Sequence, residues 1–142
     1  MNEAIKEAKK ALKHNDIPVG AVIVKNNKII AKAHNKKELK KCSTKHAEII
    51  AIEIACKKLK TWHLDDCDLY VTLEPCLMCC GAIIQSRLKN IYYGTTSNKF
   101  GYVKSIDNVF ENKNNYKPEH IENLNVIGCS KLLVDFFKDK RK

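Results

Sequence analysis

Two short groups of metal-binding side chains, far apart in the sequence, place the strongest constraint on how this chain folds. Residues 46–48 (His-Ala-Glu) form the first group, and residues 75–79 (Pro-Cys-Leu-Met-Cys) form the second. One histidine and two cysteines supply three ligands for zinc and leave a fourth position open for water, as catalytic zinc sites require. A carboxylate beside the histidine supplies a group that moves protons. The fold must therefore bring the two groups together.

The spacing within each group predicts its place on a helix. Cys76 and Cys79 are three positions apart after a proline that opens a helix, so both thiols face one side. His46 and Glu48 would diverge by about 200° on a regular helix. They converge only if His46 stands at the non-helical N-terminal boundary, where the hydroxyl residues at 43 and 44 are suited to capping. Two helix N-termini then point at the metal and favour thiolates and a zinc-bound hydroxide.

Other uses of the same residues stay open at this point. Cys80 follows Cys76 by four positions, about 40° away on a helix, so helix geometry also allows it to replace Cys79. Cys42, four positions before the histidine, could close a four-ligand structural site. That interpretation leaves Glu48 without a role. A third possibility is that the cysteines are buried and bind no metal.

Composition limits the class of protein. The chain has 142 residues, of which 44% are hydrophobic, and we expect a single domain over residues 1–142. No apolar run approaches the ~18 residues of a membrane span, and the first residues lack an apolar signal core. Seven cysteines form an odd set with three crowded together, which favours reduced thiols. We therefore expect a cytoplasmic protein.

The charge indicates a polyanionic partner. Lysine and arginine number 26 against 16 acidic residues, a formal net charge of +10. Such an excess favours nucleic acid ahead of a membrane surface. Most of the basic residues are lysine, and a drift in genomic base composition would produce the same bias, so the charge by itself is weak support.

Hydrophobic periodicity predicts an alternation of helices and strands, which is typical of an α/β layer fold. Helices are predicted over 1–14, 47–59, 75–86 and 130–142, with a short helical piece at 106–110 in an otherwise irregular segment 95–116. Strands are predicted over 19–25, 29–33, 69–73, 91–94 and 124–127, the first two forming a hairpin around two asparagines.

Longer runs of the sequence carry a family resemblance. They are Asp16–Val22, His34-Asn35, Thr44–Ile49, Leu69–Cys79, Gly81–Ile83, Ser86-Arg87, Tyr93-Gly94, Leu132-Leu133 and Phe136-Phe137. The His-Ala-Glu and Pro-Cys groups alone are typical of zinc nucleobase deaminases as a whole. The Thr-Leu-Glu-Pro-Cys-Leu-Met-Cys run, together with the Phe-Phe ending, is narrower. Nearly end to end, the chain resembles the bacterial tRNA-specific adenosine deaminases.

The resemblance implies a three-layer α/β/α cytidine-deaminase-like fold with a central five-stranded mixed sheet, assembled as a homodimer. It implies hydrolytic deamination of adenosine to inosine at the wobble position of a tRNA anticodon. One Zn²⁺ per subunit would be held by His46, Cys76 and Cys79. A zinc-bound hydroxide would attack C6 of the flipped base, with Glu48 as the proton shuttle.

The resemblance also implies substrate contacts. Asn35 would contact the flipped base, although an asparagine there also suits loop capping. Ser97, Lys99 and Phe137 would bind the anticodon stem-loop. Ser97 stands where the family usually has aspartate, which puts the preference for RNA sequence in doubt. The basic C-terminal helix would meet the anticodon region through Phe136, Phe137, Lys138, Lys140 and Arg141, and at least one of the two phenylalanines is expected in the core.

Two competing functions remain. The first is a deaminase of free nucleobases, nucleosides or nucleotides of the guanine or cytosine type, which would share the metal site. The second is a non-catalytic zinc domain that binds RNA. The net positive charge and the basic C-terminus favour an RNA substrate over a small neutral one, and neither DNA nor a membrane is expected as a partner. The intact Glu48 argues against loss of catalysis.

Overall fold

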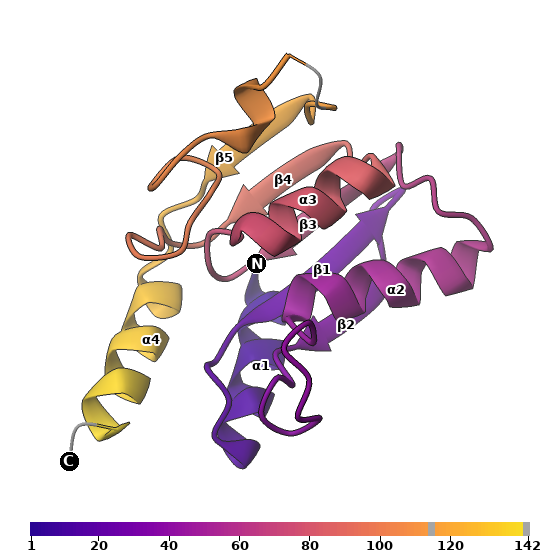
Figure 1. Ribbon diagram of the computed structural model, residues 1–142. Coiled ribbons are helices and arrows are strands. Elements are labelled where there is room, and N and C mark those ends of the chain that lie inside the picture. The colour runs from indigo at the N-terminus through magenta and orange to yellow at the C-terminus, as the bar shows by residue number, and fades with distance from the viewer. Residues whose placement is uncertain (114–115, 141–142) are drawn as a thin grey trace.

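The computed structural model describes residues 1–113 and 116–140 and contains a five-stranded mixed sheet with strand order β2-β1-β3-β4-β5 (Figure 1). β1 pairs antiparallel with β2 and β3, whereas β3, β4 and β5 run parallel to one another. The strands are β1 (Gly20–Lys25), β2 (Lys28–His34), β3 (Cys67–Val71), β4 (Asn90–Tyr93) and β5 (His120–Asn123).

Helices cover both faces of this sheet and give the three layers that the resemblance implied (Figure 1). The helices are α1 (Asn2–Ala11), which continues as the 3-10 turn η1 (Leu12–His14), α2 (Ala47–Leu59), α3 (Leu77–Ser86), the 3-10 turn η2 (Val109–Glu111) and α4 (Ile127–Lys140). α1 packs so closely on β1 that a Cβ atom at Gly20 would lie 1.9 Å from the carbonyl oxygen of Ala4. Glycine is therefore required there for packing.

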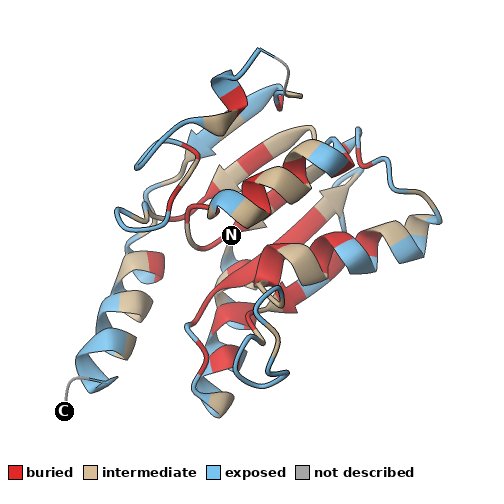
Figure 2. Ribbon diagram, viewed as in Figure 1, coloured by how far each residue is buried: buried red, intermediate tan, exposed pale blue. Residues whose placement is uncertain are grey.

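The main core fills the space between the sheet and the pair α2–α3. It contains Ile23 and Val71 from the strands, Ala51 from α2 and Ile83 from α3. Figure 2 shows buried residues along β1 and β3 and on the sides of α2 and α3 that face them, whereas α4 carries mostly exposed and intermediate residues. The two helices that carry the metal-binding groups are thus fixed against the most buried strands.

Most predicted elements are present, and the helix over 47–59 has the predicted bounds. The strand expected at 69–73 lies at 67–71, and the helix expected from Pro75 begins at Leu77, because Cys76 still has an extended backbone. The short helical piece lies at 109–111 rather than 106–110. The C-terminal helix begins at Ile127, three positions early. Its predicted last two residues, Arg141 and Lys142, lie outside the described residues.

The prediction of a last strand over 124–127 is wrong. The strand is β5, at 120–123, and it pairs with β4 through registers such as Ile91 with Ile121. The sequence of β5 alternates exposed and partly buried positions and contains little apolar surface, so the more apolar stretch that follows it was the stronger signal. That stretch instead turns at Asn125, which has a φ of 54°, and leads into α4.

Within the described ranges, no helix is long and apolar enough to cross a membrane.

Candidate metal centre

The two metal-binding groups stand at the starts of α2 and α3. His46 is the residue that precedes α2, with φ −77° and ψ 155°, and Cys76 precedes α3 with φ −76° and ψ 174°. Both therefore have extended backbones at a helix boundary, which is the condition that lets His46 and Glu48 converge. Among the residues that the structure describes, no side chain caps the first turn of α2. The prediction that a hydroxyl at 43 or 44 does so is wrong, because His46 itself occupies the capping position.

Three donor atoms meet between the two helix starts. Nδ1 of His46 lies 3.6 Å from Sγ of Cys76 and 3.7 Å from Sγ of Cys79. All three ligand atoms lie within 4.8 Å of one another. Tetrahedral coordination with Zn–S of ~2.3 Å and Zn–N of ~2.0 Å would separate nitrogen from sulfur by about 3.5 Å. The three side chains therefore fit a zinc ion without rearrangement.

The competing cysteines lie elsewhere. Sγ of Cys80 is fully buried in the main core and donates to the carbonyl oxygen of Pro75 at 3.6 Å. Sγ of Cys42 contacts the hydroxyl of Thr44 at 3.3 Å. Among the described residues, neither belongs to a group that could hold a metal. The tertiary structure thus selects Cys79 over Cys80, a choice that helix spacing left open.

The thiols of the cluster differ in charge. A hydrogen bond from Cys79 lowers the pKa of Cys76 to about 4 against the opposing effect of burial, and His46 adds to the lowering. The same hydrogen bond, together with burial, raises the pKa of Cys79. The pair thus favours a thiolate at Cys76, and binding of a cation by both sulfurs requires that the thiol proton of Cys79 be released.

Glu48 lies beside this cluster as a buried acid with an unused oxygen. Its side chain is 4% exposed, and its Oε1 is buried with no hydrogen-bond partner within the described part of the chain. Burial raises its pKa to about 7. An unpaired buried carboxylate oxygen is costly unless a ligand completes it. The arrangement suits a site where Glu48 meets bound water.

A cavity of about 320 Å³ opens onto the cluster. Its lining comes from the segment before β1, the loop after β2, the starts of α2 and α3, and the segment after β4. The lining residues are Ile17, Val19, Asn35, Lys37, His46, Ala47, Glu48, Leu73, Glu74, Cys76, Ser97 and Phe100. The lining thus combines apolar and polar side chains beside His46 and Cys76, and the volume falls within the range of small-molecule sites.

Asn35 lines this cavity and also organises its loop. Its Nδ2 donates to the carbonyl oxygen of Ile17 at 3.2 Å, and its Oδ1 accepts from the backbone N–H of Lys37 at 3.1 Å. The loop-capping role considered from the sequence is thus present. Because the side chain also lines the cavity, the same amide is within the site where a base contact was expected.

Glu74 is a second buried carboxylate in the lining, and its environment is the opposite of that of Glu48. It is 2% exposed. Burial by itself would raise its pKa, but hydrogen bonds from Ser105, Lys104 and Ser97 outweigh that effect and hold the pKa below its ordinary value. With both oxygens occupied, Glu74 is an ionised anchor rather than a group free to exchange protons.

Of the remaining described residues predicted to contact the substrate, one lines the cavity and the others lie outside it. Ser97 lines the cavity, whereas Lys99 is exposed and outside the lining, and Phe137 lies on α4 with 43% of its surface exposed. Phe136 and Phe137 touch edge to face at 5.2 Å, and Phe136 is only partly buried, so neither belongs to the main core and that expectation is wrong. Arg141 lies outside the described residues.

Sequence reasoning missed Phe100 and Glu74. Phe100 lines the cavity with 64% of its surface exposed. An exposed aromatic in a polar loop was a usable signal, because such rings mark binding surfaces. No local signal distinguished Glu74, since its partners lie more than twenty positions away.

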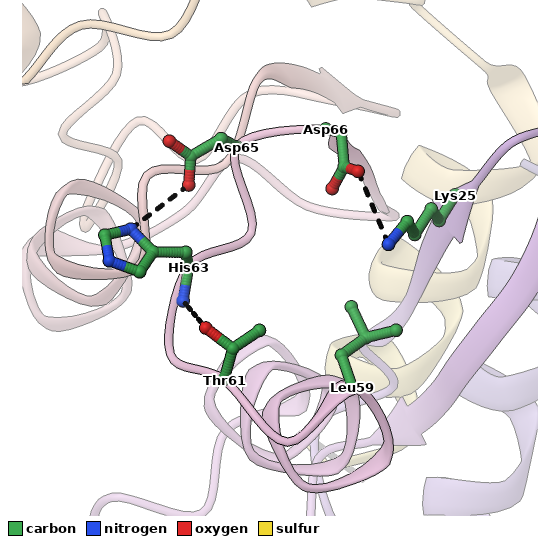
Figure 3. Close-up of a pocket in the computed structure, with 6 residues that line it drawn as sticks. All are labelled: Lys25, Leu59, Thr61, His63, Asp65 and Asp66. Carbon is green, nitrogen blue, oxygen red and sulfur yellow. Dashed lines mark hydrogen bonds and ion pairs between the residues drawn. The ribbon is translucent and has the colours of Figure 1, made fainter.

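A second depression, of about 440 Å³, lies beside Leu59, the last residue of α2, and so at the other end of that helix from His46. It is lined by Lys25, Leu59, Thr61, His63, Asp65 and Asp66. Nζ of Lys25 lies 3.4 Å from Asp66, and Nδ1 of His63 lies 3.4 Å from Asp65 (Figure 3). Its acids are more than half exposed and already paired, so this depression does not compete with the metal cluster as a reactive site.

Comparisons with known proteins agree with this geometry. A family model described as MafB19-like deaminase matches residues 1–141. A curated protein of Bacillus subtilis (strain 168), named tRNA-specific adenosine deaminase, is 43% identical over 143 residues, covering 100% of this chain and 89% of the relative.

Two solved structures extend the comparison. One, described in a study of A-to-I editing by tRNA:A34 deaminases at the wobble position of transfer RNA, is 35% identical with a TM-score of 0.89, and covers 94% of this chain and 97% of its own. The other, guanine deaminase from Bacillus subtilis, is 42% identical with a TM-score of 0.65, and covers 67% of this chain and 61% of its own.

Proposed function

The chain belongs to the family of tRNA-specific adenosine deaminases, and from that premise we propose that it hydrolyses the adenosine at the wobble position of a tRNA anticodon to inosine and ammonia. The observation that carries the proposal is the meeting of the His-Cys-Cys donor set with the unpaired Oε1 of Glu48 at one cavity. A hydrolytic deaminase needs a metal position and a proton carrier side by side.

His46, Cys76 and Cys79 would hold one zinc ion. When bound, zinc supplies a Lewis acid that makes water nucleophilic near neutral pH. Glu48 would take one proton from the attacking water through its free oxygen and deliver it to N1 of the ring, where it stays in the product. It would then carry the second proton, from the new C6 hydroxyl, to the amine. The C6–O bond forms before the C6–N6 bond breaks, so adenosine and water give inosine and ammonia.

Asn35 and Ser97 would receive the nucleotide in the cavity. Both side chains belong to its lining. The base must leave its stack to reach C6, and unstacking costs less in a hairpin loop than in a duplex. A cavity of about 320 Å³ is suited to one base rather than to a folded RNA, so the rest of the anticodon stem-loop would lie on the surface outside it.

The test is inosine formation in an anticodon stem-loop that carries a wobble adenosine, measured with zinc-loaded protein. Inosine at that position alone supports the proposal. The partial match to guanine deaminase makes free guanine the second substrate to examine. Turnover of guanine with no inosine in RNA, from a folded and metal-loaded sample, would replace the proposed substrate.

The basic end of α4 gives a prediction about RNA binding. Lys138 and Lys140 are exposed in its last turn. Replacing both by alanine is expected to weaken stem-loop binding and to reduce the slope of log K against log salt by about 1.4–1.8, as the loss of two phosphate contacts predicts. The measurement is a salt titration of binding by fluorescence anisotropy.

A charge-matched control is available on another helix. Lys57 and Lys58 lie in the last turn of α2, at the opposite end of that helix from the metal cluster. Their double alanine variant loses the same charge and should keep most of the salt slope. Equal slopes for the two double variants would mean that net charge, not the α4 tail, governs binding.

We also propose that the chain is a single deaminase domain over residues 1–142, that it is located in the cytoplasm, and that it forms a homodimer.

The homodimer is supported by an apolar groove between α2 and α3 whose lining includes Ile49, Ile52, Trp62 and Ala82. Trp62 is 56% exposed, so Trp62→Lys should weaken association without opening the core. Sedimentation equilibrium should give twice the 16.2 kDa chain mass for the wild type; a monomer at micromolar concentration would exclude this assembly.

A further inference from the structure

Glu74 lies in the cavity wall two positions before Cys76 and takes no part in the chemistry proposed above. Its carboxylate is directed at the segment 97–105, which has no regular strand or helix apart from an isolated bridge at Gly101. That segment supplies Ser97 and Phe100 to the cavity. With no regular backbone pairing, this segment depends on other contacts to hold Ser97 and Phe100 in the cavity wall.

Five donors of this segment converge on the one carboxylate. Oε1 of Glu74 accepts from the N–H of Ser97 at 3.1 Å and from the hydroxyl of Ser105. Oε2 accepts from the backbone N–H groups of Val103, Lys104 and Ser105 at 3.2, 2.9 and 3.0 Å. Hydrogen bonds to a buried charged acceptor are stronger than neutral ones. Oε1 therefore joins the two ends of the loop, at Ser97 and Ser105, and Oε2 holds only the far end.

The loop between these ends is packed against the carboxylate with no spare space. The N–H of Gly101 donates to the carbonyl oxygen of Ser97 at 2.8 Å, and a Cβ atom at Gly101 would lie 2.4 Å from Cδ of Glu74. The N–H of Tyr102 donates to the carbonyl oxygen of Pro75 at 3.0 Å. Glycine at 101 thus allows the loop to wrap around the acid directly beside Cys76.

We propose that Glu74 is a positioning residue that fixes Ser97 in the cavity wall, and so sets how tightly the nucleic-acid substrate binds. The inference rests on the proposed function for its substrate. Ordering a loop before binding removes an entropic cost that would otherwise reduce affinity. Only Oε1 holds the N–H of Ser97, whereas Oε2 holds three N–H groups at the far end of the loop. A change at Oε1 can therefore release Ser97 while the far end stays bonded.

The substitution Glu74→Gln is expected to release Ser97 while the far end of the loop stays bonded. Glutamine keeps one carbonyl oxygen, which satisfies the three N–H groups of residues 103–105 when it occupies the place of Oε2. Its NH₂ group then faces the N–H of Ser97, and two donors cannot bond. The hydroxyl of Ser105 can still accept from the NH₂ group. The substitution therefore releases Ser97 and leaves the rest of the anchor in place.

Two readouts test the release in the metal-loaded full chain. Hydrogen exchange should become faster in the peptide containing Ser97. The KM for the anticodon stem-loop should rise by about tenfold, the equivalent of one lost charge-assisted hydrogen bond. The kcat should stay within about twofold and the zinc content should equal that of the wild type, because the donor atoms and Glu48 do not contact this tether.

Ser105→Ala is the matched control. It removes the hydroxyl that donates to the same Oε1 but leaves the N–H of Ser97 bonded, so exchange at Ser97 and KM should stay close to wild type. An equal rise in KM for both variants, unchanged exchange in Glu74→Gln, or a loss of zinc would each overturn the inference, the last by giving Glu74 a role in holding the metal.

A second pair of variants decides the matter if Glu74→Gln does not fold. Ser97→Pro removes the tethered N–H, whereas Ser97→Ala keeps it. A higher KM for the proline variant than for the alanine variant supports the tether, and equal values contradict it. A wild-type protein that forms no inosine would overturn the proposed function, while the exchange rate at Ser97 would still decide whether Glu74 anchors the loop.

Discussion

Replacing Glu48 by alanine is expected to leave zinc bound and to reduce inosine formation by about 10³-fold. A positioned general acid–base group contributes roughly 10²–10⁴ in rate, and Glu48 would serve more than one proton transfer in this reaction. Its carboxylate is buried, has an unused oxygen, and stands outside the set of three donor atoms. Removing it would therefore delete the proposed proton carrier and spare the proposed metal ligands.

Glu48→Gln is the control for packing, since it keeps the shape of the side chain but cannot carry a proton at neutral pH. Both variants should bind about one zinc per chain and bind the stem-loop as the wild type does. Mass spectrometry measures the zinc content of each variant, and single-turnover inosine formation measures its rate of deamination. Loss of zinc would assign Glu48 to the metal site, and undiminished turnover would show that Glu48 is not the proton carrier.

Cys79→Ser is expected to abolish stable zinc binding, whereas Cys80→Ser should retain zinc and activity. The sulfur of Cys79 lies 3.7 Å from Nδ1 of His46, and a serine hydroxyl is a poor substitute for a thiolate ligand. The sulfur of Cys80 is directed at the carbonyl oxygen of Pro75, where a hydroxyl can donate the same hydrogen bond. Cys76→Ser should behave like Cys79→Ser.

This pair separates the metal ligand from its sequence neighbour with a change of one atom at each position. Cys80 is fully buried, so we expect its serine variant to lose about 1 kcal/mol of unfolding free energy, because part of the cost of burying a hydroxyl remains even with a hydrogen bond to Pro75. Zinc content after dialysis is the deciding measurement. Zinc retained by Cys79→Ser and lost from Cys80→Ser would overturn the ligand assignment.

Local sequence signals predicted the parts of the fold that depend on near neighbours. The helix over 47–59 matches its prediction because apolar residues at helical spacing and the boundary at His46 are contained within that one segment. The hairpin of β1 and β2 likewise follows from β-rich runs around two asparagines at positive φ. The last strand was misplaced because a polar edge strand is defined by its neighbour, not by its own composition.

For the candidate site too, some features follow from the local sequence and others only from the tertiary structure. The sequence by itself determined the donor types and their spacing, because the three ligands and Glu48 lie in two short runs at helix starts. Only the tertiary structure decided between Cys79 and Cys80, which helix geometry allows equally, since the choice depends on which sulfur faces His46 and which faces the core. It alone placed Glu74 beneath the loop of Ser97, because the hydrogen bonds join residues that no local periodicity relates.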